Sequence, residues 1–219
     1  MATSSGQREP PAHPRLRLAA CDRRSQILAA ALEVFAERGF HGTRTRELAE
    51  RAGVSEALLF HHFPSKEAVI RAIFELMKLD ERIRRMEERT RRMSPHEALV
   101  SLAEGFLTNL REEPGLFRVL FYGIMETPHL SGEFYDTFLS RLLEIETRLF
   151  ERAFRERPPA MAGALPGAAV DARIVARSFH GSLLFYMLAV AVSRIESLPA
   201  EPRALAESVV NIYLPEDTP

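Results

Sequence analysis

The segment from residue 42 to residue 69 constrains the fold of this chain more than any other part of its sequence. Its sequence is GTRTRELAERAGVSEALLFHHFPSKEAV, and its apolar spacing predicts two short helices, over 44–52 and 55–62. Gly53 and Val54 lie between them, and glycine adopts at little cost the left-handed backbone that ends a helix. Two short helices joined by so tight a turn predict a helix-turn-helix.

Residues that cap or stop helices stand at each end of this motif. Thr43 is the predicted N-cap of the first helix, and Ser55 is that of the second. Pro64 ends the second helix, and Ser65 caps a third helix whose first residue is Lys66. Free backbone N–H groups and a cation at one helix N-terminus predict a phosphate site there.

The second helix of a helix-turn-helix lies in the major groove of DNA. Leu59 and Phe63, at i and i+4, are predicted to point inward, so that the other side chains of this helix face outward. The predicted DNA contacts are Thr43, Arg44, Thr45, Arg46, Ser55, Glu56, Ala57, Leu58, Phe60, His61, His62 and Lys66.

This segment resembles the N-terminal domain of the TetR family of bacterial transcriptional regulators. The matching residues are Ile27, Ala30, Ala31, Phe35, Gly39, Phe40, Thr43, Thr45, Leu48, Ala49, Ala52, Gly53, Val54, Ser55, Leu59, Phe63, Ser65, Lys66 and Glu67. The match covers about a third of the chain, from Asp22 to Phe74, and beyond it only length and helical pattern agree. The resemblance implies a dimer with an N-terminal DNA-binding domain and a C-terminal domain that binds a small effector.

Three positions of the second helix depart from the pattern that is usual in this family. Phe60 stands where the family usually has a tyrosine, Leu58 where it has threonine or serine, and Glu56 where lysine is common. A carboxylate repels phosphate, although it accepts a hydrogen bond from the amino group of cytosine. The residues expected to carry the phosphate contacts instead are Thr43, Arg44, Arg46 and Lys66.

Charge is distributed unevenly along a chain that is nearly neutral overall. Its 219 residues have a net charge of −1, yet residues 15–66 carry nine Arg and Lys against six Asp and Glu, as suits a DNA-binding region. We predict a disordered basic arm over 1–19, a helix-turn-helix domain over 20–66, and an effector-binding and dimerisation domain over 67–219. The arm is either a solvated tail or a minor-groove contact.

Helical spacing dominates the rest of the chain, so the predicted class is all-α. The predicted helices are 22–38, 65–93 with a break near 79–80, 94–112, one opening at 114, 131–157, 171–195 and 202–214. The longest apolar run, Leu183–Val192, is too short to span a bilayer, so no membrane contact is expected. The single cysteine, Cys21, allows no intrachain disulfide, which fits a cytoplasmic protein.

A helix that is apolar on all sides, as predicted over 183–192, must be covered on all sides. The resemblance implies that the last two helices, Asp171–Ile195 and Pro202–Tyr213, form a four-helix interface with a second copy. The predicted homodimer contact therefore lies within residues 171–213.

The C-terminal domain has no pattern of catalytic or metal-ligating residues, so no enzyme, cofactor or metal is expected. Its aromatic and methionine residues are either ordinary core or the lining of a pocket for an apolar ligand. His180 is likewise either a core histidine with one partner or a ligand contact. The predicted ligand-binding residues are Phe106, Leu110, Phe117, Phe121, Tyr122, Met125, Phe138, Leu142, His180 and Leu184.

The predicted function is ligand-responsive regulation by a repressor. The dimer is expected to bind a palindromic double-stranded DNA operator and to be released by a small apolar or amphipathic effector. One alternative is a regulator controlled by a protein partner, or without any effector, and an exposed apolar patch outside the dimer face favours it. The other is an all-helical enzyme, which converging titratable groups in the C-terminal domain favour.

Overall fold

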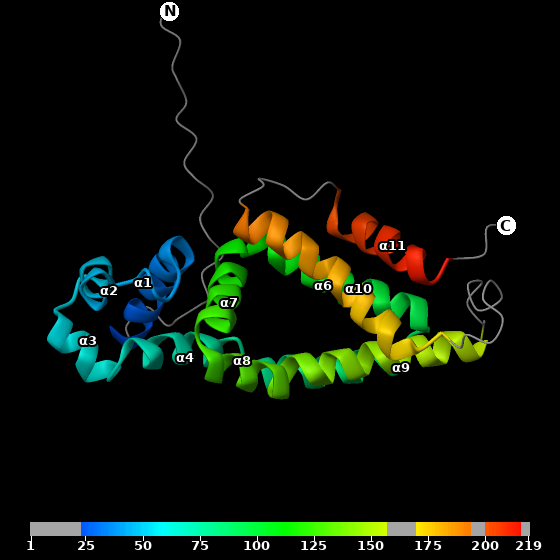
Figure 1. The fold of residues 1–219 in the computed structure, drawn as a ribbon, viewed down its shortest axis with the longest axis horizontal. Coiled ribbons are helices and arrows are strands. Elements are labelled where there is room, and N and C mark those ends of the chain that lie inside the picture. Colours follow the sequence, from blue (N-terminus) through cyan, green and yellow to red (C-terminus); the bar gives the residue numbers. More distant parts are fainter. Residues whose placement is uncertain (1–22, 157–169, 194–199, 216–219) are drawn as a thin grey trace, which may run out of the picture.

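The computed structural model describes residues 23–156, 170–193 and 200–215, and every regular element within these ranges is a helix. The predicted all-α class is therefore confirmed. The predicted arm over 1–19, Cys21 and most of the interval 157–170 between α9 and α10 lie outside the described residues. Figure 1 shows an elongated molecule with a small head at one end and a larger helical body.

The head is built from four helices and the body from the rest. The head helices are α1 (Arg23–Arg38), α2 (Thr45–Ala52), α3 (Glu56–His62) and α4 (Lys66–Leu76). The body helices are α5 (Leu79–Thr90), α6 (Pro95–Glu112), α7 (Pro114–Glu126), α8 (Pro128–Phe134), α9 (Ser140–Glu156), α10 (Ala172–Met187) and α11 (Pro202–Tyr213). Two π-helical turns, η1 (Tyr135–Leu139) and η3 (Leu188–Val192), join α8 to α9 and extend α10.

The predicted break in the connecting helix separates α4 from α5. It lies at Met77 and Lys78, slightly before the predicted position, and Lys78 adopts the left-handed conformation with φ +47°. Helix α6 begins with a capping box at Ser94, whose hydroxyl accepts from the backbone of Glu97 while the Glu97 carboxylate accepts from Ser94 N. The helix predicted over 131–157 begins earlier, at Pro128, because proline suits the first position of a helix.

Two hydrophobic cores are present, and the head core reaches beyond the predicted domain boundary at residue 66. It takes four buried residues from α4, which include Ile70 and Ile73, together with Leu116 and Val119 of α7. The second core joins α6, α9, α10 and α11 in the body. One face of helix α7 thus packs in the head core, although α7 lies among the body helices in the sequence.

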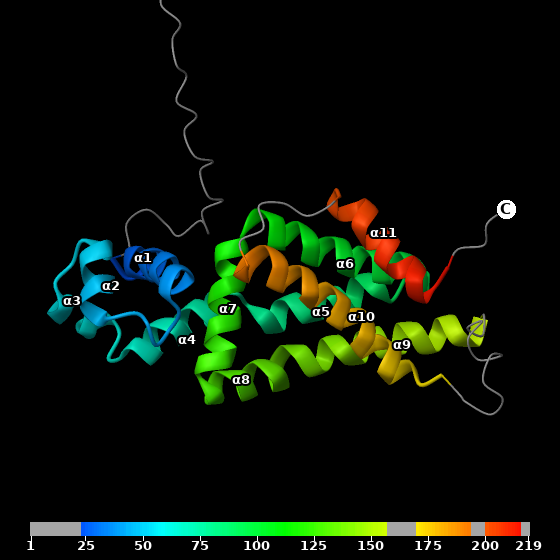
Figure 2. The same ribbon diagram turned by 45° about the horizontal axis from the view of Figure 1, so that its top comes forward.

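In both views α7 stands between the head and the remaining body helices (Figures 1 and 2). Its Arg118 donates from Nη1 to the carbonyl of Ala36 in α1 at 3.1 Å and from Nε to the carbonyl of Ala191 in η3. At its C-terminal end, the Glu126 carboxylate accepts from the backbone N–H of His41 at 2.7 Å. Hydrogen bonds as well as packing therefore connect α7 to the head.

Candidate nucleic-acid interface and effector region

The turn between α2 and α3 has the geometry that its sequence predicts. Gly53 is left-handed, with φ +65°, and the N–H of Val54 bonds to the carbonyl of Ala49 at 2.9 Å. Ser55 then caps α3, because its Oγ accepts from Leu58 N at 3.1 Å. These bonds set the direction in which α3 leaves the head.

One face of α3 is anchored in the head, and the opposite face is open to solvent. Leu59 and Phe63 are buried, as predicted. The exposed residues at the start and the outer face of α3 are Ser55, Glu56, Ala57, Phe60 and His61, and Leu58 and His62 are half-buried beside them. This face is available to a DNA groove, which is what a recognition helix requires.

Glu56, the acidic residue of this face, is held by a residue of α2. Its Oε1 accepts a hydrogen bond from Thr45 Oγ1 at 2.9 Å. The structure therefore brings these two predicted contacts together. The second carboxylate oxygen keeps the capacity to accept from a cytosine amino group.

The two arginines at the start of α2 differ in their surroundings. Arg46 forms an exposed ion pair with Glu50 at 2.8 Å, one turn along α2. Arg44 occupies the N-cap position and is exposed. Because Arg46 already has a carboxylate partner, Arg44 is the better placed of the two to neutralise phosphate.

Thr43 does not cap α2, which corrects the prediction for its side chain. Arg44 is the N-cap residue, and Thr43 is only 2% exposed. Its hydroxyl donates to the carbonyl of Gly39 at 2.7 Å. The side chain of Thr43 therefore closes the loop between α1 and α2 from the inside.

Lys66 also points to the inside of this loop. Its Nζ donates to the carbonyl of Phe40 at 2.6 Å and to that of Thr43 at 3.0 Å. The same ammonium lies 4.3 Å from the centre of the Phe40 ring, which adds a cation–π contact. Its predicted role in holding phosphate stays a prediction, and in this geometry its visible role is to fix the loop.

The predicted ligand residues lie in the body at three levels of burial. Leu110, Leu142 and His180 are buried, and Met125 is 67% exposed. The half-buried residues are Phe106, Phe117, Phe121, Tyr122, Phe138 and Leu184. All the half-buried ones except Tyr122 pack against the body core from α6, α7, η1 and α10. Their role in ligand binding stays a prediction.

Glu146 is a body residue that the sequence-based reasoning missed. It is 1% exposed, and its Oε1 lies 3.2 Å from Nδ1 of His180, which is thus a buried histidine with one partner. The signal was present, because Glu146 falls between Leu142 and Leu149 on the apolar face of α9. An acidic residue on that face is unusual for a core.

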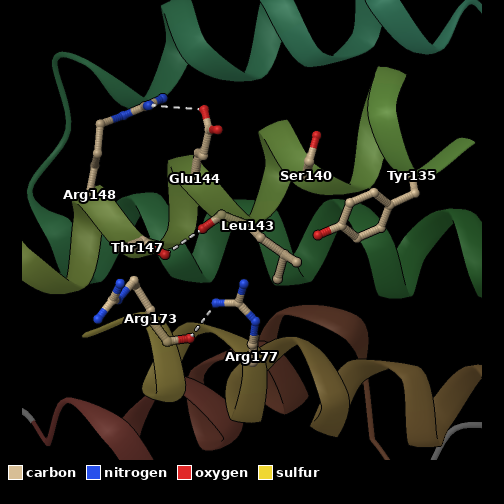
Figure 3. Close-up of a pocket in the computed structure, with 8 residues that line it drawn as sticks. All are labelled: Tyr135, Ser140, Leu143, Glu144, Thr147, Arg148, Arg173 and Arg177. Carbon is tan, nitrogen blue, oxygen red and sulfur yellow. Dashed lines mark hydrogen bonds and ion pairs between the residues drawn. The ribbon is translucent and has the colours of Figure 1, made fainter. Parts of the chain in front are cut away.

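A pocket of about 260 Å³ opens between α9 and α10 (Figure 3). It is lined by Tyr135, Ser140, Leu143, Glu144, Thr147, Arg148, Arg173 and Arg177. None of the predicted ligand residues belongs to this set. Two of its three arginines are paired with carboxylates, Arg148 with Glu87 and Glu144 and Arg173 with Asp171. Within the described residues, no group of three or more His, Cys, Asp and Glu is placed to hold a metal ion.

Comparison with known proteins places the head in a family. The model for bacterial regulatory proteins of the tetR family matches residues 27–73, from α1 into α4. RutR, an HTH-type transcriptional regulator from Escherichia coli K12, is 51% identical to this chain over 51 residues. The head is thus similar to the N-terminal region of TetR-family regulators. Other curated proteins that match the same region, such as UidR from Escherichia coli K12, are also HTH-type transcriptional regulators.

Sequence likeness to curated TetR-family proteins is confined to a short region, whereas the fold is shared more widely. The alignment with RutR covers 23% of this chain and 24% of RutR. A TetR-like regulator from Rhodococcus sp. RHA1 superposes with a TM-score of 0.67 at 25% identity, over 89% of this chain and 96% of that one. FadR from Bacillus subtilis, solved in complex with stearoyl-CoA, has a TM-score of 0.65 at 21% identity, over 86% and 96%.

His61 is expected to set base preference in this TetR-family head, because its ring is exposed on the outer face of α3. The variant His61→Ala should lose about 1–3 kcal/mol of discrimination at one base pair. Its affinity for random DNA should stay unchanged, since that affinity depends on phosphate contacts. Selection of binding sites from a random library measures both quantities. Equal losses on selected and random DNA would contradict this role.

Proposed function

We propose that this protein is a transcriptional regulator that binds a palindromic operator as a homodimer. A small apolar or amphipathic molecule that binds in the body releases it, so that it acts as a repressor. The observation that carries the proposal is the face of α3, which is exposed on one side, capped by Ser55 and anchored through Leu59 and Phe63. Its place of action in this proposal is the cytoplasm.

Exposed apolar side chains on α10 and α11 support the homodimer. Ile174, Phe185 and Leu188 form one stripe along α10 and η3 and are 65%, 66% and 39% exposed. Gly181 lies on the same stripe, where a side chain would meet open space, and Ile212 of α11 is 74% exposed. In a monomer this apolar surface is exposed to water, which is unfavourable, whereas in a homodimer a second copy covers it.

The same stripe accounts for the apolar character of the segment Ala172–Val192. This segment is long and apolar enough to cross a membrane by length and composition alone. Its inner face, however, contributes Phe179, Leu183 and Met187 to the body core. One face of the segment packs into the body core and the other is proposed to pack against a second copy. These two contacts explain its apolar composition without a membrane.

The half-buried aromatic residues of the body support an apolar or amphipathic effector. Phe106, Phe117 and Phe138 come from three different elements and pack against the body core without being fully buried by it. Stearoyl-CoA, the molecule found with the Bacillus subtilis FadR of similar fold, is amphipathic. A ligand of that general kind matches apolar walls that have polar groups at their edge.

Coupling between the effector and DNA would run through α7. Arg118 bonds to Ala36 in the head and to Ala191 beside the dimer stripe, and Glu126 bonds to the loop that precedes α2. A ligand that shifts α7 or α10 therefore changes the separation of the two recognition helices in the dimer. It weakens DNA binding by its differential affinity for the two arrangements.

The test is binding to the DNA that flanks the coding region of this protein. Footprinting should reveal two half-sites about 34–36 Å apart, or a multiple of that distance. Candidate amphipathic molecules are then titrated into the complex while DNA release is followed by fluorescence anisotropy. A protein that binds no DNA sequence selectively would refute the proposal, and one that binds its operator but ignores every bound ligand would refute the effector part.

A further inference from the structure

The pair formed by Glu146 and His180 leaves one polar atom of the body core unexplained. Oε1 of Glu146 accepts or shares the hydrogen bond with Nδ1 of His180 at 3.2 Å. Oε2 is buried and has no hydrogen-bond partner among the described residues. Both side chains are more than nine-tenths buried.

None of the residues that the structure describes satisfies this oxygen. The neighbours of Glu146 on the same face of α9 are apolar, with Leu142 one turn before it and Leu149 and Phe150 one turn after it. Burial raises the pKa of Glu146, while the hydrogen bond and the charge of His180 act in the opposite direction. If Glu146 is ionised, Oε2 has no donor to accept a hydrogen bond from. If Oε2 carries the proton of the neutral acid, that proton has no acceptor.

A buried carboxyl of this kind does not serve stability, because a leucine in its place would pack without any polar penalty. Buried polar groups without a partner are rare in folded proteins, and each one calls for an explanation such as strain, a functional role or a bound water or ion. Two of the predicted effector residues also lie one helical turn from the pair. Leu142 precedes Glu146 by four residues on α9, and Leu184 follows His180 by four on α10.

Both helices that carry the pair are irregular close to these residues. The π-helical turn η1 ends three residues before Leu142, and η3 begins four residues after Leu184. Such turns interrupt regular helical bonding and are found frequently at functional sites. The unpaired oxygen thus belongs to a pair of packed helices, α9 and α10, each of which adjoins an irregular turn.

We propose that Oε2 of Glu146 is the polar anchor of the effector site, and that the effector carries a hydrogen-bond donor, such as an amine or a hydroxyl, beside an apolar chain. This inference rests on the proposed function, since it names the chemistry of the ligand that the body binds. His180 is a positioning residue, because its bond to Oε1 leaves Oε2 for the ligand. A carboxylate in an apolar site also disfavours ligands that offer only acceptors.

Three probes of equal chain length separate donor recognition from simple apolar binding. Octylamine and 1-octanol both carry a donor, whereas octyl methyl ether carries only an acceptor. Calorimetric titration of the full-length protein should show that the two donor probes bind about tenfold more tightly than the ether, the ratio expected for one hydrogen bond to a charged group. Equal affinities, a preference for the ether, or no binding of any probe would overturn the proposal.

Variants assign this preference to the carboxylate. Glu146→Leu should abolish it by weakening the amine and the alcohol while the ether binds as well or better. Glu146→Gln, which keeps the size and an acceptor oxygen, should lose the preference for the amine but keep part of that for the alcohol. The matched control is Glu151→Leu, which removes an exposed carboxylate from the same helix and should keep the wild-type ratio. A ratio that survives in Glu146→Leu would overturn the proposal.

The positioning role of His180 is tested by the ratio of the affinity for the donor probes to the affinity for the ether, rather than by the overall level of binding. His180→Leu should reduce the ratio, and His180→Asn should restore part of it, because its amide nitrogen can take the place of Nδ1. A ratio unchanged in His180→Leu would exclude the positioning role. Operator release is measured with the same probes. Donor-dependent binding without release would refute the effector part of the proposed function and leave the Glu146 site standing.

Discussion

Replacing both Phe185 and Ile212 by glutamate is expected to yield a folded monomer whose operator affinity is at least about 100-fold weaker than that of the wild type. Phe185 and Ile212 are 66% and 74% exposed, so the substitutions leave both cores intact. In a dimer, the new carboxylates would be buried against apolar surface, which is strongly unfavourable. A monomer binds one half-site at a time and loses the gain from two linked recognition helices.

Sedimentation equilibrium and fluorescence anisotropy measure the two parts of this prediction. Circular dichroism should show unchanged helix content, because the substituted side chains take no part in the helix hydrogen bonds. The matched control is Tyr135→Glu, since Tyr135 is 47% exposed on η1, outside α10 and α11. That variant should remain dimeric. A dimeric double variant would show that this apolar stripe is not the interface.

The substitution Lys66→Met is expected to lower the unfolding free energy by about 2–4 kcal/mol, since two charge-assisted hydrogen bonds are lost at once. Methionine keeps the length of the side chain but leaves the carbonyls of Phe40 and Thr43 without their donor. The cation–π contact with Phe40 is lost as well. Because the loop between α1 and α2 loses its clamp, affinity should fall for all DNA sequences.

The salt dependence of DNA binding distinguishes this structural role from a phosphate contact. A lysine that neutralises one phosphate contributes about 1 to the slope of log affinity against log salt concentration. Lys66→Met should therefore reduce stability and leave the slope unchanged, measured at a temperature where the variant is folded. Arg44→Met, which removes an exposed arginine, should reduce the slope and leave stability unchanged. A lower slope with unchanged stability for Lys66→Met would restore the phosphate role.

The local elements of the head were predictable because each depends on residues close together in the chain. A left-handed glycine at 53 and a capping serine at 55 act over three or four residues, so the pattern alone indicates them. The hydrogen bonds of Lys66 to the loop were not predicted, for the opposite reason. Its partners are carbonyls of Phe40 and Thr43, more than 20 residues away, and no spacing rule relates an ammonium to a distant loop. Thr43 was misplaced because its hydroxyl turns back to the loop rather than forward to α2.

In the body, periodicity located the helices but not their irregularities or their partners. The π-helical turns at 135–139 and 188–192 have no reliable sequence signature, and they shift which side chains face inward after them. Gly123 is a further residue whose role the sequence alone does not predict. A Cβ there would lie 2.9 Å from the Phe74 ring, so glycine is needed for the close approach of α7 to α4. Such an approach exists only once the two helices have packed.

The sequence by itself determined the helical class, the helix-turn-helix and the likeness of the head to the TetR family, because caps, turns and apolar periods are properties of short segments. The tertiary structure alone decided that Lys66 fastens a loop, that α7 joins the head to the body through Arg118, and that Glu146 is buried beside His180 with one oxygen unpaired. The physical reason is that hydrogen bonding and burial depend on distances in space. Residues 26, 34 or 82 positions apart become neighbours only after the helices have packed.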